Sequence, residues 1–294
     1  MAVVTNTTTT AQISVNAKEI DFVSRFQGNW QALAEIMGIS RPVRKAPGTT
    51  LTTLKANVTL ANGNVAEGDE VPLSQATVTA TEIEAITIEK YRKRVTIEAI
   101  EKYGAAVAMQ KTDDAFVTEL TDKVLDKFYT FAQTGTLGGD TYDDFQMAVS
   151  MAIALTKDHF KKLHLGYGNI VVFANTLDAG KYLGQAGITV QTQNGIEYLK
   201  NFLGASTVIL TSEIPAGKVI ATPADNLVLY YVDPADSDFA QAGLDYTTVG
   251  ETRLIGVHKE GVYDRASSDT HAIMGMRLFA EYLDGIANVS IKTA

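Results

Sequence analysis

Two stretches of the chain carry apolar residues at intervals of three and four, the spacing of an amphipathic helix. In residues 17–38 this pattern predicts two short helices that break at Gly28. Residues 112–133 predict a longer helix with one apolar stripe. Thr112 is expected to cap this helix, because a threonine hydroxyl can accept a hydrogen bond from a free backbone N–H of the first turn.

An alternation of apolar and polar positions with a period of two predicts strands in residues 51–60 and 76–91. Asn62-Gly63 is a turn signal, and a polar loop follows at residues 67–74. The expected ribbon is rich in threonine and poor in large apolar residues, and a lone two-stranded ribbon is marginal in water. Ordering its backbone costs roughly 1–2 kcal/mol per residue. We therefore expect a projecting arm that a neighbouring molecule stabilises.

Helix and strand patterns alternate in much of the remaining chain, which favours one compact α+β domain over about residues 141–265. The predicted helices cover residues 95–103, 142–155, 176–183 and 195–203, and the predicted strands cover residues 170–173, 207–210, 218–221 and 227–232. A later strand is expected at residues 272–282, with a helix over 273–283 as the alternative. Asp284-Gly285 predicts a hairpin turn. The threonine-rich first fifteen residues are expected to fray.

Composition narrows the class of protein. The chain has 294 residues, of which 46% are apolar and 20% are charged, values typical of a folded chain. It contains no cysteine, which excludes disulfides, thiolate metal sites and cysteine nucleophiles. The net charge of −9 argues against tight binding to duplex nucleic acid. The sequence has no apolar run of about 18 residues and no signal-peptide pattern, so we expect no membrane partner and disfavour a secreted adhesin.

The residue types that carry chemistry do not form a recognisable site in the sequence. His159 and His164 are five positions apart, which does not place them on one helix face as metal ligands. Asp233, Asp236 and Asp238 miss the spacing of a calcium loop, and the glycines do not follow the pattern of a phosphate-binding loop. Asp269 and His271 follow a serine closely, but adjacency in sequence does not create a catalytic triad. We expect no catalytic residue, no cofactor and no metal.

One basic cluster stands out, at residues 90–94. We interpret it either as an inter-subunit ion-pair site or as a solvated strand end. Nucleic-acid binding ranks below both interpretations, because only Tyr91 could stack on a base. Basic residues also gather before the ribbon, and acidic residues gather at its expected tip. The candidate inter-subunit contacts are Arg41, Arg44, Lys45, Glu67, Asp69, Glu70, Lys90, Arg92, Lys93 and Arg94.

The order of these stretches resembles that of a known family. Residues 67–72, Glu-Gly-Asp-Glu-Val-Pro, look like the tip of an extended loop, and residues 87–99 look like the junction that follows it. The remaining matching stretches look like a spine helix, axial-domain strands and closing strands, at residues 112–128, 212–217 with 227–230, and 276–292. Over about residues 50–292 the chain thus resembles the major capsid proteins of tailed bacteriophages and, more remotely, the encapsulin shells.

The resemblance implies an α+β fold of a particular kind. This phage major capsid protein fold has an N-terminal arm, an extended β-hairpin loop, a peripheral domain with a long spine helix, and an axial domain. The corresponding segments are residues 1–50 for the arm, 51–92 for the loop, 93–140 and 266–294 for the two parts of the peripheral domain, and 141–265 for the axial domain.

The resemblance also implies a function. Copies of the chain would assemble as hexamers and pentamers, in the host cytoplasm, into the icosahedral head of a virion that encloses double-stranded DNA without sequence-specific binding. A portal protein would be a partner, and so would a separate scaffolding protein, because the chain lacks the long charged N-terminal domain of some relatives. No lysine lies between Glu67 and Glu82, so no covalent cross-link through the loop is expected. An encapsulin-like compartment shell and a soluble enzyme of unknown reaction are the alternatives.

Overall fold

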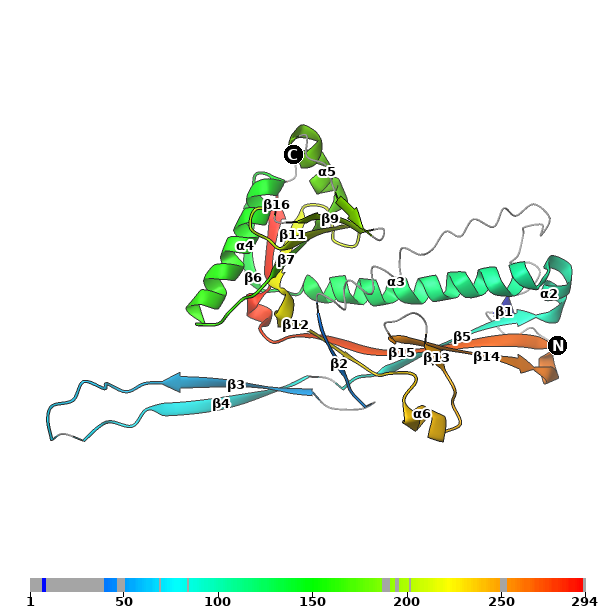
Figure 1. Cartoon of the computed structure of the whole chain (residues 1–294), viewed down its shortest axis with the longest axis horizontal. Helices are drawn as coiled ribbons and strands as arrows, with labels where there is room; N and C mark the ends of the chain where they lie inside the picture. Colours follow the sequence, from blue (N-terminus) through cyan, green and yellow to red (C-terminus); the bar gives the residue numbers. More distant parts are fainter. Residues whose placement is uncertain are drawn as a thin grey trace.

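The computed structural model describes residues 7–8, 40–46, 51–68, 70–83, 85–186, 191–193, 196–200, 202–248 and 253–292. Figure 1 shows a body built from sheets and helices, from which one long hairpin projects. The expected α+β fold class is confirmed, because helices and strands follow one another in mixed order along the chain. The helices predicted in residues 17–38 lie outside the described residues, and so does Asp69.

The projecting hairpin consists of β3 (Leu51–Thr59) and β4 (Gln75–Ile83), which pair antiparallel as the alternation predicted. They form a two-stranded sheet of their own and pair with no other strand of the described residues. Residues 60–74 close the hairpin outside this ladder. The hairpin points away from the body (Figure 1), and its distal residues are therefore exposed.

The second strand of the ribbon is shorter than predicted. It was expected to continue to residue 91, but residues 85–87 belong to no strand, and the chain resumes as β5 (Ile88–Thr96) in a different sheet. The side chain of Ile86 is buried and packs with Val232 of the body. This contact redirects the chain from the hairpin into the body.

The first sheet of the body follows the order β1-β5-β15-β12-β2, and β14 with β13 is attached beside β15. Its longest member, β15 (Ser267–Ala280), confirms the strand predicted near the C-terminus and excludes the helical alternative. The other strands are β1 (Thr7–Thr8), β2 (Arg41–Arg44), β12 (Leu227–Tyr231), β13 (Thr247–Thr248) and β14 (Ile255–Val262). Because β1 pairs in parallel with β5, the start of the chain, which was expected to fray, is held at these two threonines.

A long helical segment packs across the first sheet. α2 (Ile97–Tyr103) ends where the predicted helix of residues 95–103 ends but begins two residues later, because β5 continues to Thr96. A π-helical segment, η2 (Ala106–Lys111), then leads directly into α3 (Thr112–Ala132). The predicted bounds of α3 are confirmed, but the predicted cap is wrong. The Thr112 hydroxyl donates to the Ala108 carbonyl (2.7 Å), because the preceding residues are already helical.

The second sheet has the order β6-β16-β11-β7-β10-β9-β8. Its strands are β6 (Leu137–Tyr142), β7 (Ile170–Asn175), β8 (Gln191–Gln193), β9 (Ile196–Lys200), β10 (Thr207–Thr211), β11 (Lys218–Pro223) and β16 (Ala287–Ile291). Strands predicted at β7, β10, β11 and β12 are confirmed. Residues 195–203 were predicted as a helix, but they contain β9, which pairs with β10. Tertiary pairing here overrides the local pattern.

Two helices cover one face of the second sheet. α4 (Phe145–Lys162) begins later than the predicted residue 142, and its cap is Asp144, whose carboxylate accepts the Met147 N–H (2.7 Å). α5 (Thr176–Ala186) agrees with its prediction. Short helical turns complete the chain at η3 (Ala224–Asn226), α6 (Ser237–Gln241), η4 (Tyr263–Arg265) and η5 (Leu283–Gly285).

The main core lies between α3 and both sheets. Leu120 and Phe128 of α3 are fully buried there, and the Phe128 ring meets Phe173 of β7 edge to face, with 5.6 Å between the ring centroids. Leu229 of the first sheet and Ile220 of the second belong to the same cluster. Because the two sheets share one core, α3 fixes them relative to each other.

β15 and β16 lie in different sheets, so the hairpin turn predicted at Asp284-Gly285 is wrong. η5 carries the chain from one sheet to the other, and a Cβ on Gly285 would approach the Phe160 ring to 2.6 Å.

The two sheets also divide the chain differently from the domains expected from the sequence. β12 and β14 of segment 141–265 pair in the first sheet, whereas β6 and β16 of the outer segments pair in the second. The domain boundaries therefore stay a prediction.

Candidate inter-subunit surfaces

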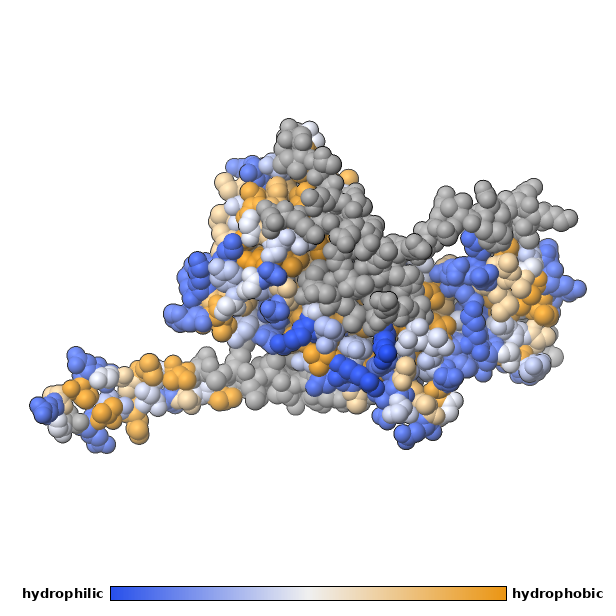
Figure 2. All heavy atoms as spheres, viewed as in Figure 1, coloured by the Kyte–Doolittle hydropathy of each residue, from blue (hydrophilic) through white to orange (hydrophobic). Residues whose placement is uncertain are grey.

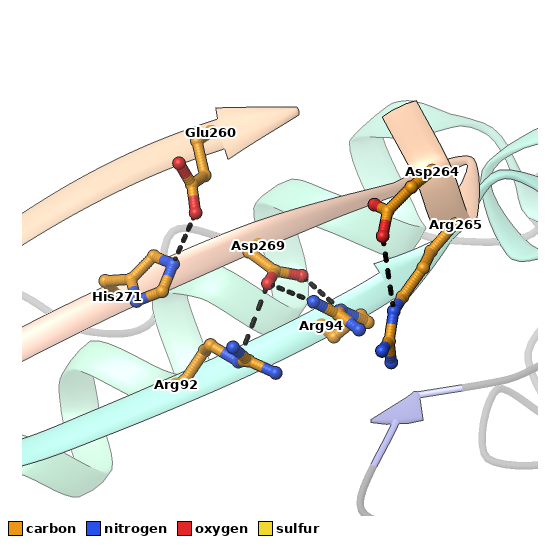
Figure 3. Close-up of polar contacts among 7 residues, drawn as sticks. All are labelled: Arg92, Arg94, Glu260, Asp264, Arg265, Asp269 and His271. Atoms are coloured by element: carbon orange, nitrogen blue, oxygen red, sulfur yellow. Dashed lines mark hydrogen bonds and ion pairs between the residues drawn. The ribbon is translucent and has the colours of Figure 1, made fainter. Parts of the chain in front are cut away.

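The basic run on β5 is divided between the two faces of the first sheet, because successive side chains of a strand point in opposite directions. On one face Arg94 lies directly opposite Asp269 of β15. Its guanidinium donates to both carboxylate oxygens, from Nε at 2.5 Å and from the terminal nitrogen Nη2 at 2.6 Å (Figure 3). The Nε of Arg92 lies 3.5 Å from the same carboxylate. The hydrogen bonds from Arg94, against the effect of burial, hold the pKa of Asp269 below its ordinary value.

Lys93 points to the opposite face, toward the start of α3. Its ammonium pairs with Asp113 and donates to the Thr112 hydroxyl (2.7 Å). Asp113 also accepts the Thr270 hydroxyl (2.9 Å) and pairs with Lys259 (2.5 Å). Burial opposes ionisation of Asp113, but these donors lower the pKa of its carboxyl, whereas burial lowers the pKa of Lys93. The cluster ties α3 to β5, β14 and β15.

A second polar cluster ties the other half of α3 to β5. The Tyr91 hydroxyl and the Lys127 ammonium both donate to Glu89, and the Lys123 ammonium lies 5.1 Å from the centre of the Tyr91 ring. Burial and the hydrogen bond to Glu89 raise the pKa of Tyr91 to about 12. Burial opposes ionisation of Glu89, but the bonds from Lys127 and Tyr91 lower its pKa.

One group of side chains in the described residues has the composition of a metal site. Glu260, Asp269 and His271 each place one ligand atom within 4.8 Å of the others, and His271 Nε2 lies 3.0 Å from a Glu260 oxygen (Figure 3). Both oxygens of Asp269 already accept hydrogen bonds from Arg94, so a cation would have to compete with a buried guanidinium. The arrangement therefore fits an ion-pair network better than a metal site.

The basic residues before the hairpin also pair within the chain. Arg41 on β2 pairs with Glu281, and Arg44 pairs with Asp236 at 2.6 Å. Lys45 lies 5.7 Å from the centre of the Tyr230 ring. The hydrogen bond from Arg44 lowers the pKa of Asp236. These contacts anchor β2 along β12, with which it pairs in parallel.

The structure therefore separates the predicted contact residues into two groups. Arg94, which is only 8% exposed, and Lys93 neutralise buried carboxylates of the same chain. Lys90 and Arg92 are exposed on the strand, and Glu67 and Glu70 are exposed near the hairpin tip. Arg41 and Arg44 have in-chain partners but remain half-exposed. The charges of the exposed residues therefore remain accessible for ion pairs with a neighbouring subunit.

The distal hairpin carries an apolar surface that sequence reasoning missed. Its exposed large apolar side chains are Val58, Leu60, Val71, Leu73 and Val78, with exposed fractions of 62%, 80%, 64%, 96% and 64%. The register pairs Val58 with Ala76 and Val78 with Ala56, and Figure 2 shows apolar patches along this part of the hairpin. The sequence did contain a signal for this apolar surface, since apolar residues alternate along the strands. The threonines between them led the sequence analysis to describe the ribbon as poor in large apolar residues.

A groove of about 520 Å³ lies where the hairpin leaves the body. One wall is the C-terminal half of α3, and the other is the second half of β15 with the start of β5. Its lining mixes apolar and charged side chains: Thr87, Glu89, Asp126, Lys127, Thr130, Phe131, Met276, Arg277, Leu278 and Phe279. No sequence pattern predicted this groove, because its walls come from three distant segments.

No protein-family model matches the chain, and no curated protein matches its sequence. Solved structures do match it. The cyanophage A-1(L) capsid superimposes with a TM-score of 0.62 at 15% identity, over 98% of this chain and 99% of that chain. The mature capsid of bacteriophage PhiM1 gives 0.62 at 7% identity, over 94% and 90%. The SrpI encapsulin complex from Synechococcus elongatus gives 0.55 at 8% identity, over 93% of both chains.

These similarities establish the fold. The chain has the phage major capsid protein fold, which it shares with an encapsulin over nearly its whole length. The resemblance inferred from the order of the sequence stretches is thereby confirmed at the level of the fold. None of the helices in the described part of the chain combines the length and apolar character needed to cross a bilayer.

Proposed function

We propose that this chain is the major capsid protein of a tailed bacteriophage, a structural subunit with no catalytic role. Copies assemble as hexamers and pentamers into the icosahedral head of the virion, which encloses double-stranded DNA. The observation that carries the proposal is the projecting hairpin, whose apolar side chains are exposed in the single chain. It is supported by a fold that this chain shares with capsid proteins over nearly its whole length.

The hairpin is the element that needs a neighbour. Burying one large apolar side chain contributes about 1.5–3 kcal/mol, and the distal hairpin exposes several of them. A two-stranded sheet without such burial is marginal in water. In the proposed shell the arm (residues 1–50) and the loop (51–92) lie across adjacent subunits, which cover this surface.

The rest of the chain supplies the other contacts of the shell. The axial segment (141–265) meets its copies around the fivefold and sixfold axes, while segments 93–140 and 266–294 form the periphery. Each contact buries roughly 800 Å² per partner, and many such contacts together hold the shell closed. The exposed charges at Arg41, Arg44, Glu67, Glu70, Lys90 and Arg92, together with the partly buried Lys45 and with Asp69, set the register between neighbours.

Assembly in the host cytoplasm requires further partners. A separate scaffolding protein directs the curvature of the growing shell, and a portal protein occupies one vertex. The net charge of −9 limits adhesion between the wall and the packaged DNA, so the DNA is enclosed without sequence-specific binding.

Electron microscopy of the purified chain, alone and together with a candidate scaffolding protein, tests the proposal. We expect closed particles or regular hexamers and pentamers. A chain that stays monomeric under both conditions, or that forms small oligomers whose melting temperature shifts with a small ligand, would instead support a soluble enzyme.

An encapsulin-like compartment shell is the second candidate function. It is favoured by the encapsulin match, which covers 93% of both chains. The contents of the particle and the neighbouring genes discriminate between the two functions. Packaged DNA with portal and terminase genes nearby supports the phage head, whereas an enclosed enzyme encoded beside the shell gene supports the compartment.

A further inference from the structure

One half of β15 has a strand neighbour on one side only. β5 pairs with β15 as far as Ile88 opposite Gly275, and Val232, directly after β12, donates its N–H to the Gly275 carbonyl (2.9 Å). Since both approach the same residue, β5 and β12 lie on opposite sides of β15. Beyond Gly275, β15 pairs with β12 alone, and no strand of the described residues continues the line of β5.

Among the described residues, this half of β15 therefore has backbone groups on one side that no strand pairs with. Successive residues of a strand direct their N–H and C=O groups to opposite sides. Gly275 bonds toward β12, and so does Glu281, whose N–H donates to the Asn226 carbonyl (3.0 Å). The intervening even-numbered residues, Met276, Leu278 and Ala280, consequently direct their backbone groups to the open side. A free strand edge of this kind is a template for another strand.

The open edge faces the groove between β15 and α3. Met276 and Leu278 line the groove from the strand, and Thr130 and Phe131 line it from the helix. A groove of about 520 Å³ has room for a short extended segment rather than a whole domain. An occupant must supply backbone donors and acceptors toward β15 and apolar side chains toward Phe131.

The distal hairpin of the same chain has both properties. Residues 70–74 belong to no helix, turn or strand and lie outside the ladder of β3 and β4, and Val71 and Leu73 are exposed. Pro72 lacks an N–H, which a strand tolerates only where that position faces away from its partner. Val71 and Leu73 flank Pro72, so their N–H groups point to the other side. Both can bond to an edge while Pro72 faces away from it.

The hairpin points away from the body (Figure 1), whose α3 and β15 line the groove, so the tip and the groove can meet only between copies. We propose that residues 70–74 of a second copy add as a strand to the open edge of β15, beside Met276–Ala280. The inference rests on the proposed shell function, since it names the partner of the hairpin. Docking a tip into the neighbour's groove is a head-to-tail contact, and such contacts close into rings when the rotation between copies permits it.

The absence of cysteine allows a clean cross-linking test. Leu73→Cys and Thr130→Cys, combined in one full-length chain, place one thiol near the tip and one on the exposed wall of the groove. Under mild oxidation, assembled particles should give a ladder of disulfide-linked chains that is absent from dissociated subunits. Each single variant should give at most dimers. The matched control combines Leu73→Cys with Ala115→Cys, another exposed position on α3 about 22 Å along the helix.

A ladder from the control pair, or no ladder from the test pair in intact particles, overturns the strand addition and leaves the shell function standing. Failure of the unmodified chain to form particles overturns both the strand addition and the shell function.

Hydrogen exchange on the unmodified chain provides a second measurement, which needs no substitution. Amides of the peptide that spans residues 276–280 should exchange at least about tenfold more slowly in particles than in subunits. Unchanged exchange there, while other surfaces gain protection, also overturns the proposal.

Discussion

Helix α3 and the β3–β4 hairpin are both long, regular elements, yet their apolar side chains have very different surroundings. Leu120, Val124 and Phe128 of α3 are buried by the two sheets of the same chain. Leu60 and Leu73 of the hairpin are exposed. Burial contributes free energy only where it occurs. The body is therefore stabilised by one chain, and the hairpin gains its apolar contribution only from a partner.

The charged groups differ between the two regions in the same way. In the body, carboxylates such as Asp113 and Asp269 are buried and receive several donors from one chain. At the hairpin, Glu67 and Glu70 are exposed to solvent. Substitutions in the body should therefore change the stability of the subunit, and substitutions in the hairpin should change its assembly.

The largest effect is expected from the core. Phe128→Ala should lower the free energy of unfolding of the dissociated subunit by about 3–5 kcal/mol, because it leaves a cavity beside Phe173. Chemical denaturation measures this change. Leu73→Ala, made at an exposed apolar residue of the hairpin, should change the same quantity by less than about 0.5 kcal/mol. Equal losses from the two substitutions would contradict the separation of the regions.

The next effect concerns the buried pair of Arg94 and Asp269. Arg94→Leu should cost about 2–4 kcal/mol of subunit stability, because the buried carboxylate loses both hydrogen bonds from Arg94 and keeps only the more distant ion pair with Arg92. The control is Arg41→Leu, which breaks the half-exposed pair with Glu281 and should cost less than about 1 kcal/mol. If the order of the two costs were reversed in denaturation experiments, Arg94 would not be the stabilising member of the basic run.

The hairpin should show the opposite behaviour to the core. The double substitution Leu60→Ser with Leu73→Ser should leave subunit stability within about 0.5 kcal/mol, but it should raise the concentration needed for assembly by about tenfold or more. Light scattering against protein concentration measures that threshold. Thr59→Ser serves as the control on the neighbouring polar position. An unchanged threshold would mean that no partner covers these apolar side chains.

The smallest expected effect is the acid dependence of the Asp113 cluster. Donors from Lys259, Lys93 and Thr270 hold the folded pKa of Asp113 below 3.8, its ordinary value. The resulting stabilisation is complete above that ordinary pKa and is lost as the pH falls through the folded value. Asp113→Asn should therefore lower stability near neutral pH and flatten the loss of stability between about pH 5 and about pH 2.

Measurement of the unfolding free energy across this pH range tests the prediction. Glu67→Gln, which removes one exposed carboxylate from the hairpin tip, should leave the dependence as it is in the unmodified chain. A steeper acid loss in Asp113→Asn would show that the buried carboxylate destabilises the body.

Elements with a strong local pattern could be predicted from the sequence. The alternation in β3 and the apolar stripe of α3 each identified the element and placed its ends within about two residues. The candidate contacts were less predictable. Lys90–Arg94 was recognisable as a basic run, but its division between a buried face and an exposed face depends on the carboxylates that α3 and β15 bring to it.

Long-range pairing decided what the local pattern could not. Residues 196–200 have a sequence compatible with a helix, but β10 offers a strand edge to which they bond. Asp284-Gly285 has the sequence of a hairpin turn, but β16 pairs with β11 in the other sheet, so the segment crosses between layers. The Arg94–Asp269 pair joins residues that are 175 positions apart in the chain.

The sequence by itself determined which segments could be helix or strand and that one ribbon could not bury its own surface, because periodicity and local propensity act over a few neighbouring residues. The tertiary structure decided which strands share a sheet, which charges are buried, and which edge of β15 stays open. Those features depend on contacts between distant segments, and their free energy exists only once the chain has brought them together.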